Sequence, residues 1–341
     1  MTDRVSLRTA FLAKAGWADA VISDLAGDAS NRRYFRLHQG SSQAVLMDAP
    51  PEKGEDVRPF MEIAVFLRAQ DLSAPEIFAE DRDAGFLLLE DLGDALFARV
   101  VASDPACEGD LYAAAIDVLI ALHQTPVPKG LAAYDKDLMA DLSALAFDWY
   151  ASAATGGDFA AVRERFATEF AEFLTPVADQ SDVLIQRDYH AENLIWLPSR
   201  DGVARVGLLD FQDALTGHRA YDLVSLLQDA RRDVSPDLER AMIDRYVRGS
   251  GVDRTSFEAA YALLGLQRNL RIIGVFARLC VRDGKPHYVD LIPRVWAHMV
   301  RDLKKVEFAK LETVLLANLP PPDEQTLTIL REKCGTIPTQ S

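Results

Sequence analysis

A segment near the middle of the chain carries residues that suit metal-assisted chemistry. Four residues separate Asp188 from Asn193 in RDYHAEN, and Asp210 follows after two apolar stretches, Leu194–Leu197 and Arg205–Leu209, that flank PSRDG. Such stretches around a turn sequence predict a β-hairpin that returns the chain towards Asn193. Carboxylate and carboxamide oxygens suit magnesium, and a further carboxylate can accept a proton. The set therefore suits phosphoryl transfer from ATP, which needs magnesium across the phosphates and a base for the acceptor.

Two alternatives exist for single residues of this segment. Asp188 taken alone could be a turn former, because Asp is common in loops. His190 could act as a general base, but we expect it to brace the loop because Asp188 already fills the base role. The agreement of order, spacing and intervening hairpin favours the catalytic interpretation.

The first ninety residues predict a small lobe of short strands around one helix. Apolar residues at helical spacing indicate the helix Val57–Ala69. Alternating or continuous apolar runs separated by turn sequences indicate strands, and DRDAG places a glycine at a tight hairpin turn. The expected strands are Ala20–Leu25, Tyr34–Leu37, Ala44–Met47, Ile77–Ala79 and Phe86–Leu89.

After Gly93 the pattern becomes mainly helical. We therefore predict an α+β fold with two lobes, residues 1–91 binding nucleotide and residues 92–341 carrying catalytic and substrate groups. A short strand, Val183–Ile185, precedes the catalytic segment, and a short C-terminal helix follows the prolines at 320–322. The expected helices are Leu111–His123, Leu138–Ala153, Ala160–Leu174, Ala220–Ala230, Leu238–Gly249 and Ser256–Cys280.

Composition bounds the function. The net charge of −15 argues against a general nucleic-acid binder, which needs a basic face. We expect no signal peptide and no membrane span, and three scattered cysteines favour a reducing cytoplasm. Ten basic residues lie between Arg268 and Lys310 against four acidic ones. They form either a solvated helical face or a local attraction for an anionic ligand.

The string QRDYHAENLIW…VGLLDFQDA resembles the catalytic and metal-binding loops of the aminoglycoside phosphotransferase family, distant relatives of protein kinases. The resemblance implies a protein-kinase-like fold that uses ATP and Mg²⁺, with Asp188 as base and Asn193 and Asp210 as metal ligands. It also implies that Asp222, in RAYDLVSLL, braces the catalytic loop, and that Glu62 occupies the place of the kinase helix glutamate.

The residues expected to bind the nucleotide follow the family pattern less closely than the catalytic segment does. Backbone amides of the turn at 27–33 could cover phosphates, and we expect contacts from Ser30, Asn31, Arg32 and Arg33. The segment LLEDLG resembles the family's lobe connection, whose backbone from Glu90 to Leu92 would face adenine. Met47 stands where the family's third strand carries a phosphate-binding lysine. Arg32, Arg33 or Lys53 could supply that charge, and the sequence does not choose among them.

Two further strings, MDAPPEK with RPF and QRNLRIIGVFAR with RDGKP, resemble a bacterial branch of cell-wall sugar kinases. This resemblance covers roughly residues 5–335 and implies phosphorylation of the C1 hydroxyl of N-acetylmuramate and N-acetylglucosamine during wall recycling. The alternatives are another small-molecule kinase, such as one for aminoglycosides, and a nucleotide-binding scaffold with weak turnover. Oligomeric state is not predicted. Expected acceptor contacts are Tyr189, Glu192, Asp213 and Arg271.

Overall fold

The computed structural model describes residues 3–25, 31–305 and 309–337, without the side chains of 309 and 310. The chain forms two compact units: Met1–Leu122 with Ala191–Ala214, and His123–His190 with Leu215–Ser341. These units are defined by packing, whereas the expected division at residues 91 and 92 is a functional one and stays a prediction. The α+β fold class is confirmed, with an antiparallel sheet in the first unit and mainly helices in the second.

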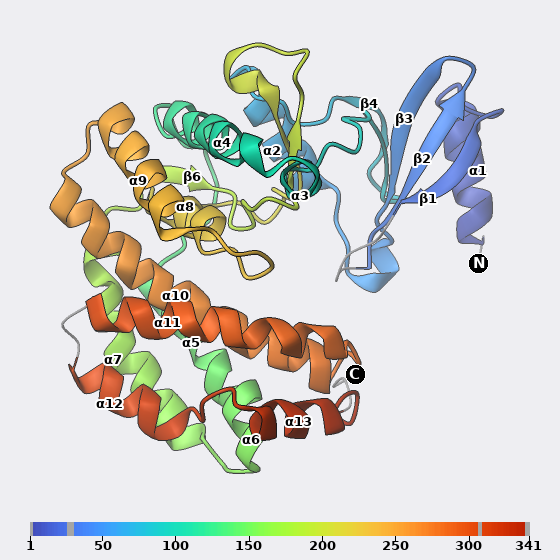
Figure 1. The fold of residues 1–341 in the computed structure, drawn as a ribbon. Helices are drawn as coiled ribbons and strands as arrows, with labels where there is room; N and C mark the ends of the chain where they lie inside the picture. Colours follow the sequence, from blue (N-terminus) through green and yellow to red (C-terminus); the bar gives the residue numbers. More distant parts are fainter. Residues whose placement is uncertain (1–2, 26–30, 306–308, 338–341) are drawn as a thin grey trace. The chain divides into compact units, whose positions relative to one another are not determined.

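The first unit contains a five-stranded antiparallel sheet, in the order β1-β2-β3-β5-β4 (Figure 1). Each predicted strand is present. Gly85 makes the β4–β5 turn possible, because its φ is +70° and a Cβ there would lie 2.0 Å from the Ala49 carbonyl oxygen. The strands are β1 (Val21–Leu25), β2 (Arg33–Gln39), β3 (Ser42–Asp48), β4 (Ile77–Asp81) and β5 (Phe86–Leu89).

Two helices accompany this sheet, where the sequence predicted one. Helix α2 (Arg58–Ala69) is the predicted helix and buries Phe60, Ile63 and Leu67 on one face. Helix α1 (Arg4–Lys14) was not predicted, and it packs Phe11 and Leu12 into the core formed by the sheet (Figure 1). Only these two side chains of α1 are buried, so its apolar pattern is too short to stand out in the sequence.

The remainder of the first unit carries the hairpin of the catalytic segment. The hairpin is held by backbone bonds at both strands: Trp196 donates to the Ala95 carbonyl at 2.8 Å, and Leu208 donates to the Ser73 carbonyl at 2.9 Å. Its strands and the adjacent helices are β7 (Leu194–Trp196), β8 (Val206–Leu208), α3 (Phe97–Ser103) and α4 (Glu108–Leu122).

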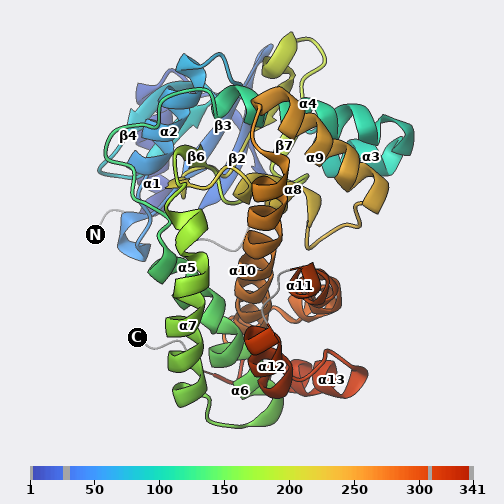
Figure 2. The same ribbon diagram turned by 90° about the vertical axis from the view of Figure 1, so that its left-hand side faces the viewer.

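The second unit is built around the long helix α10 (Arg254–Val281), which Asp253 caps by accepting the Ser256 amide. Figure 2 shows α5 and α7 running alongside one another, with α10 packed against α5 and α11. Helices α11 and α12 and strand β9 were not predicted. The elements are α5 (Lys136–Leu145), α6 (Ser152–Thr155), α7 (Ala160–Ala178), β6 (Val183–Ile185), β9 (Leu215–Gly217), α8 (Tyr221–Leu227), α9 (Pro236–Ser250), α11 (Ile292–Lys305), α12 (Ala309–Asn318) and α13 (Glu324–Glu332).

The expected single helix Leu138–Ala153 is interrupted. A π-helical turn at Ala146–Ala151 separates α5 from α6. The backbone of Leu145, just before this turn, is approached closely by Gly274 of α10, where a Cβ would lie 2.3 Å from the Leu145 carbonyl carbon. Glycine at 274 is therefore what lets α10 pack against the end of α5. Within the described parts of the chain, no helix is long and apolar enough to cross a membrane.

Candidate active site

The predicted hairpin brings the two proposed metal ligands together in the first unit. Leu194 of β7 pairs with Leu208 of β8, and the Leu209 amide donates to the Asn193 carbonyl at 3.0 Å. The ladder thus ends with Asn193 beside Asp210, and Asn193 Nδ2 lies 3.5 Å from Asp210 Oδ2. Local hairpin geometry is sufficient to produce this pair.

The residues after Asp210 fix its orientation. Asp210 has a positive φ of 56°, a conformation that non-glycine residues adopt mainly where surrounding structure enforces it. Gln212 Nε2 donates to Asp210 Oδ1 at 2.7 Å. Phe211 is buried and stacks on Phe60 of α2 with ring centroids 4.8 Å apart. Asp210 is therefore held between a packed aromatic ring and a side-chain hydrogen bond.

This pair fits a magnesium ion in its donor chemistry. A carboxylate and a carboxamide at hydrogen-bonding distance offer two oxygens, and magnesium completes its shell with water and phosphate oxygens. Among the described residues, no group of three or more His, Cys, Asp or Glu side chains could hold a metal by itself. The donor set of Asn193 and Asp210 suits a magnesium ion that takes its other oxygens from water and phosphate.

The catalytic loop ahead of Asn193 is anchored in the second unit by Asp222 of α8. Asp222 Oδ2 accepts the Gln186 amide at 2.7 Å, and its Oδ1 accepts the Arg187 amide at 2.9 Å. Arg187 has a φ of 71°, and the Ser225 hydroxyl donates to its carbonyl at 3.2 Å. These three bonds hold a strained residue in place directly before Asp188.

Charged neighbours in the second unit act on Asp188. Burial by itself would raise the pKa of Asp188, but the positive charges of Arg271, Arg268 and Arg187, with His190 where it is protonated, outweigh it and lower the pKa below its usual value. A lowered pKa keeps the carboxylate ionised at neutral pH. Asp188 is therefore in the protonation state that a proton acceptor needs.

His190 differs from Asp188 in its environment. Burial lowers the pKa of His190 to about 4, against the opposing charge of Asp229, so the imidazole is neutral at physiological pH. Its Nε2 lies 3.4 Å from Arg231 Nη1, a donor. These contacts fit the predicted bracing role, which stays a prediction.

The other predicted acceptor residues differ in accessibility. Tyr189 is buried in the second unit, at 1% exposure, whereas Glu192 and Asp213 are exposed in the first unit. Glu62, predicted at the kinase helix glutamate position, is exposed on α2. A side-chain contact from Tyr189 to an acceptor thus has the least support of these predictions.

The basic region of the sequence separates into two kinds of residue. Arg282, Arg294 and Arg301 are held in ion pairs with Asp283, Asp233 and Glu239. Lys310 has a side chain outside the described residues. Two other residues of this region, both on α10, act on the charge of Asp188.

Those residues are Arg268 and Arg271. Arg271 is half-buried, with Nη1 3.3 Å from the Tyr221 hydroxyl. Arg268 is 3% exposed and donates from Nη2 to the Ser225 hydroxyl at 2.8 Å. Its Nε and Nη1 have no hydrogen-bond partner among the described residues. Burying a guanidinium costs free energy unless it is bonded, so this cluster is a candidate for function as much as for stability.

The predicted phosphate loop is partly described. Ser30 lies outside the described residues. The Asn31 amide donates to Glu55 Oε1 at 2.9 Å, and Arg32 Nε donates to Glu55 Oε2 at 2.8 Å. Arg33 is exposed at the start of β2. Glu55, which sequence reasoning did not select, thus joins two of the predicted nucleotide residues.

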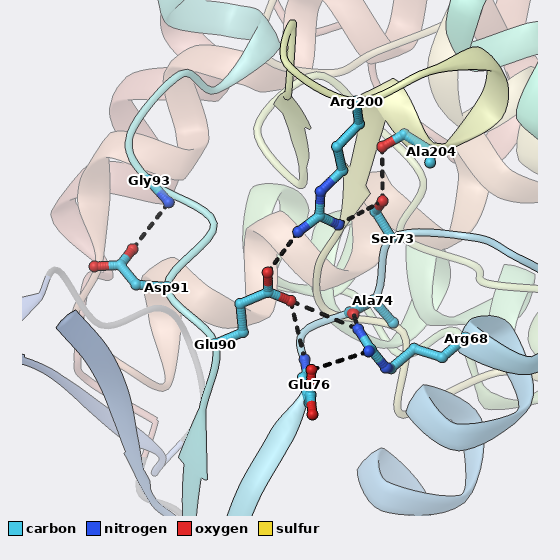
Figure 3. A network of polar contacts seen from close by, with 9 residues as sticks. All are labelled: Arg68, Ser73, Ala74, Glu76, Glu90, Asp91, Gly93, Arg200 and Ala204. Atoms are coloured by element: carbon cyan, nitrogen blue, oxygen red, sulfur yellow. Dashed lines mark hydrogen bonds and ion pairs between the residues drawn. The ribbon is translucent and has the colours of Figure 1, made fainter. Parts of the chain in front are cut away.

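The segment predicted to connect the lobes is fastened by a polar network in the first unit (Figure 3). Arg200, from the β7–β8 connection, reaches both Glu90 and the Ser73 hydroxyl, while Arg68 Nη1 lies 3.6 Å from Glu90 Oε2. The Glu76 amide also donates to Glu90 Oε2 at 3.3 Å. Glu90 is therefore held through its side chain, whereas the predicted contact with adenine concerns the backbone.

A third arginine binds the acidic side chains that follow Glu90 in this segment. Arg36 of β2 donates from Nε to Asp91 at 2.6 Å and from Nη1 to Asp94 at 2.7 Å. Asp91 Oδ1 also accepts the Gly93 amide at 2.9 Å (Figure 3). The acidic residues between 90 and 94 were visible in the sequence, but two of their arginine partners, Arg36 and Arg200, lie 55 and 110 residues away along the chain.

Two solved structures that share this fold are a choline kinase and an aminoglycoside phosphotransferase. The chain matches a choline kinase from Streptococcus pneumoniae with a TM-score of 0.61 at 13% identity, covering 87% of this chain and 99% of that one. It matches an ADP-bound aminoglycoside phosphotransferase, APH(2'')-Ib, with a TM-score of 0.57 at 16% identity, covering 83% and 94%. At such identities the likeness shows the kinase-like fold.

Comparison of the sequence with known proteins identifies the family of this chain. Residues 21–260 match the phosphotransferase enzyme family, and the chain belongs to that family. It is 40% identical over 334 residues to a protein of Caulobacter vibrioides named N-acetylmuramate/N-acetylglucosamine kinase, covering 87% of this chain and 92% of that protein. A Pseudomonas aeruginosa protein of the same name is 36% identical, covering 89% and 91%. The predicted resemblance to phosphotransferases and to this branch is confirmed.

Proposed function

We propose that this protein transfers the γ-phosphoryl group of ATP to the anomeric C1 hydroxyl of N-acetylmuramate and N-acetylglucosamine. The observation that carries the proposal is the ionised Asp188, held among arginines on an anchored loop, five residues before Asn193. The names of the relatives from Caulobacter and Pseudomonas support the acceptor. The reaction would return recovered cell-wall sugars to metabolism in the cytoplasm, where ATP is available.

In the proposed reaction the C1 hydroxyl oxygen attacks the γ-phosphorus while Asp188 accepts the hydroxyl proton. The bond from the γ-phosphorus to the β–γ bridging oxygen breaks, and ADP leaves. Asn193 and Asp210 would hold Mg²⁺, which neutralises charge on the phosphates when bound. Phosphoryl transfer depends mainly on such positioning and electrostatics.

A base whose pKa is lowered, as that of Asp188 is, requires an acceptor hydroxyl that is more acidic than an ordinary alcohol. The ring oxygen withdraws electron density from C1, so an anomeric hydroxyl is more acidic than an ordinary alcohol. A weak base can accept its proton at less cost, because efficient transfer needs donor and acceptor of similar strength. On the acceptor side, Arg268 and Arg271 provide positive charge next to Asp188 for the lactyl carboxylate of N-acetylmuramate.

The test is a transfer assay with γ-labelled ATP and paired sugars. N-acetylmuramate and N-acetylglucosamine should accept label, and their methyl 1-glycosides, which lack only the free anomeric hydroxyl, should not. Asp188→Asn should lower kcat by roughly 10²–10⁴, the usual contribution of general-base assistance. Labelling of the methyl glycosides would move the reaction to another hydroxyl, and an active Asp188→Asn variant would remove Asp188 as the base. Labelling of aminoglycosides or amino alcohols instead of both sugars would reject the acceptor assignment.

A further inference from the structure

The first unit lacks a cation at the strand position where relatives of protein kinases hold a phosphate. Met47 occupies this position on β3 and pairs across the sheet with Tyr34 of β2. It is 1% exposed, and a thioether carries no charge for a phosphate oxygen. A kinase that uses ATP must therefore supply this positive charge from another residue.

Two of the three cations nearby in the sequence are poorly placed for that role. Arg33 and Lys53 are exposed, and among the described residues neither has a hydrogen bond or ion pair that would orient its charged group. A freely rotating side chain loses more conformational entropy on binding a phosphate than one already held in place.

Arg32 is held in place. Its Nε lies 2.8 Å from Glu55 Oε2 in an ion pair whose two side chains are mostly buried. Glu55 Oε1 accepts the Asn31 amide at 2.9 Å, and Asn31 Nδ2 donates to the Lys53 carbonyl at 3.2 Å. Glu55 therefore ties the start of β2 to the turn that follows β3 and fixes the guanidinium of Arg32 between them.

The charge of Arg32 also lies near the predicted metal ligand. Burial lowers the pKa of Arg32, but Tyr34, Glu55 and Asp210 outweigh it and raise the pKa above its usual value. Burial raises the pKa of Tyr34 to about 12, with opposing effects from Arg32 and a further increase from Asp210. The charge of Asp210 thus raises the pKa of both Arg32 and Tyr34. A cation near the metal ligand is near the phosphates that the metal would bridge.

We infer that Arg32, positioned by Glu55, is the phosphate-binding cation of this enzyme, taking over the role of the missing strand lysine. Glu55 then does for Arg32 what the helix glutamate does for the lysine in protein kinases, which agrees with the exposure of Glu62. The planar guanidinium can donate two parallel hydrogen bonds to a phosphate while Nε stays on Glu55. The inference rests on ATP as phosphoryl donor in the proposed function, but not on the identity of the acceptor.

Equilibrium binding without any acceptor sugar tests this inference. Calorimetry compares Mg-ATP with adenosine, which lacks phosphates, for wild type, Arg32→Ala and the neighbouring control Arg33→Ala. Loss of a charge-assisted hydrogen bond should weaken Mg-ATP binding by about 10- to 150-fold in Arg32→Ala. Adenosine affinity should be unchanged, and Arg33→Ala should bind both ligands as wild type does.

Two conservative variants separate a binding role from a structural one. Arg32→Lys keeps the charge and should recover part of the Mg-ATP affinity. Glu55→Gln keeps the shape but loses the ion pair, and should weaken Mg-ATP without affecting adenosine. Equal weakening of ATP and adenosine by Arg32→Ala, or a loss as large in Arg33→Ala, would overturn the inference. A wild-type protein that binds no Mg-ATP would overturn the proposed function with it.

Discussion

Asp222→Asn should release the catalytic loop while leaving the nucleotide side unchanged. The Asp222 carboxylate is fully buried and accepts the amides of Gln186 and Arg187 at 2.7 and 2.9 Å. Asparagine keeps one acceptor oxygen, but its NH₂ group must face the other backbone N–H. One amide next to the strained Arg187 is then left without an acceptor, and the loop carrying Asp188 loses half of its anchor.

The size of the effect follows from these contacts. A hydrogen bond to a charged group contributes ~1.5–3 kcal/mol, and a buried unsatisfied donor costs ~1–3 kcal/mol. Burial raises the pKa of Asp222 to about 7, so the buried charge itself is unfavourable and offsets part of the gain. We therefore expect Asp222→Asn to lower the free energy of unfolding at pH 7 by about 2 kcal/mol, near the lower end of the range for a hydrogen bond to a charged group. If the whole of this free energy were lost from the ordered state of the loop that carries Asp188, kcat would fall by up to roughly 30-fold.

Urea unfolding and steady-state kinetics measure the two quantities. The control is Leu330→Ala, which empties a fully buried site on α13 and should cost ~2–5 kcal/mol of stability without touching the loop. Asp222→Asn should lower kcat well below the Leu330→Ala value, with KM for ATP unchanged. Equal kcat in the two variants would show that the loop does not depend on Asp222, and wild-type stability would refute the hydrogen-bond argument itself.

Four further outcomes follow from the same contacts. Asp210→Ala should abolish the magnesium-dependent part of ATP binding measured by calorimetry, and unchanged affinity and stoichiometry would exclude Asp210 as the ligand. Arg271→Met should lower kcat/KM for N-acetylmuramate by ~10- to 150-fold more than for N-acetylglucosamine, with Arg282→Met, whose arginine is paired with Asp283, as the silent control. Equal losses for both sugars would reject the carboxylate role of Arg271. Because the folded pKa of Asp222 is about 7 against an ordinary 3.8, the folded state binds the extra proton between these values. The part of its contribution to the free energy of unfolding that depends on pH should therefore be full below pH 3.8 and be lost as pH rises through about 7, and Asp222→Asn should remove this dependence. Arg200→Ala should raise KM for ATP with little change in kcat, because Glu90 loses a partner in the segment predicted to face adenine, and Arg200→Lys should restore part of the difference. A fall in kcat without a change in KM would place Arg200 outside the nucleotide site.

Much of the local structure was determined by sequence alone. The strands of the first unit, helix α2, and the hairpin joining Asn193 to Asp210 all follow from patterns within a few tens of residues. Turn residues and alternating apolar positions fix such elements without help from distant parts of the chain. The pair of proposed metal ligands could be predicted for the same reason, because both flank one hairpin.

Local sequence patterns did not determine the short helices and strands, nor where each one begins and ends. Strand β9 has three residues and exists because it pairs with β6 thirty residues earlier, and α1 forms against a sheet that comes later in the chain. The π-helical turn before α6 has no signal of its own, since Gly274 of α10 creates the close approach there. Tertiary packing overrides or completes local preference at such places.

The choice among similar charged residues also depended on tertiary structure. Arg32 and Arg33 are equivalent in the sequence, and only the position of Glu55 distinguishes them. Arg271 was expected from the sequence, but Arg268 was not, and only the fold placed both beside Asp188 and paired other arginines of α11 with carboxylates. Electrostatic interactions depend on distance in space and on burial, and neither quantity is encoded in the spacing of residues along the chain.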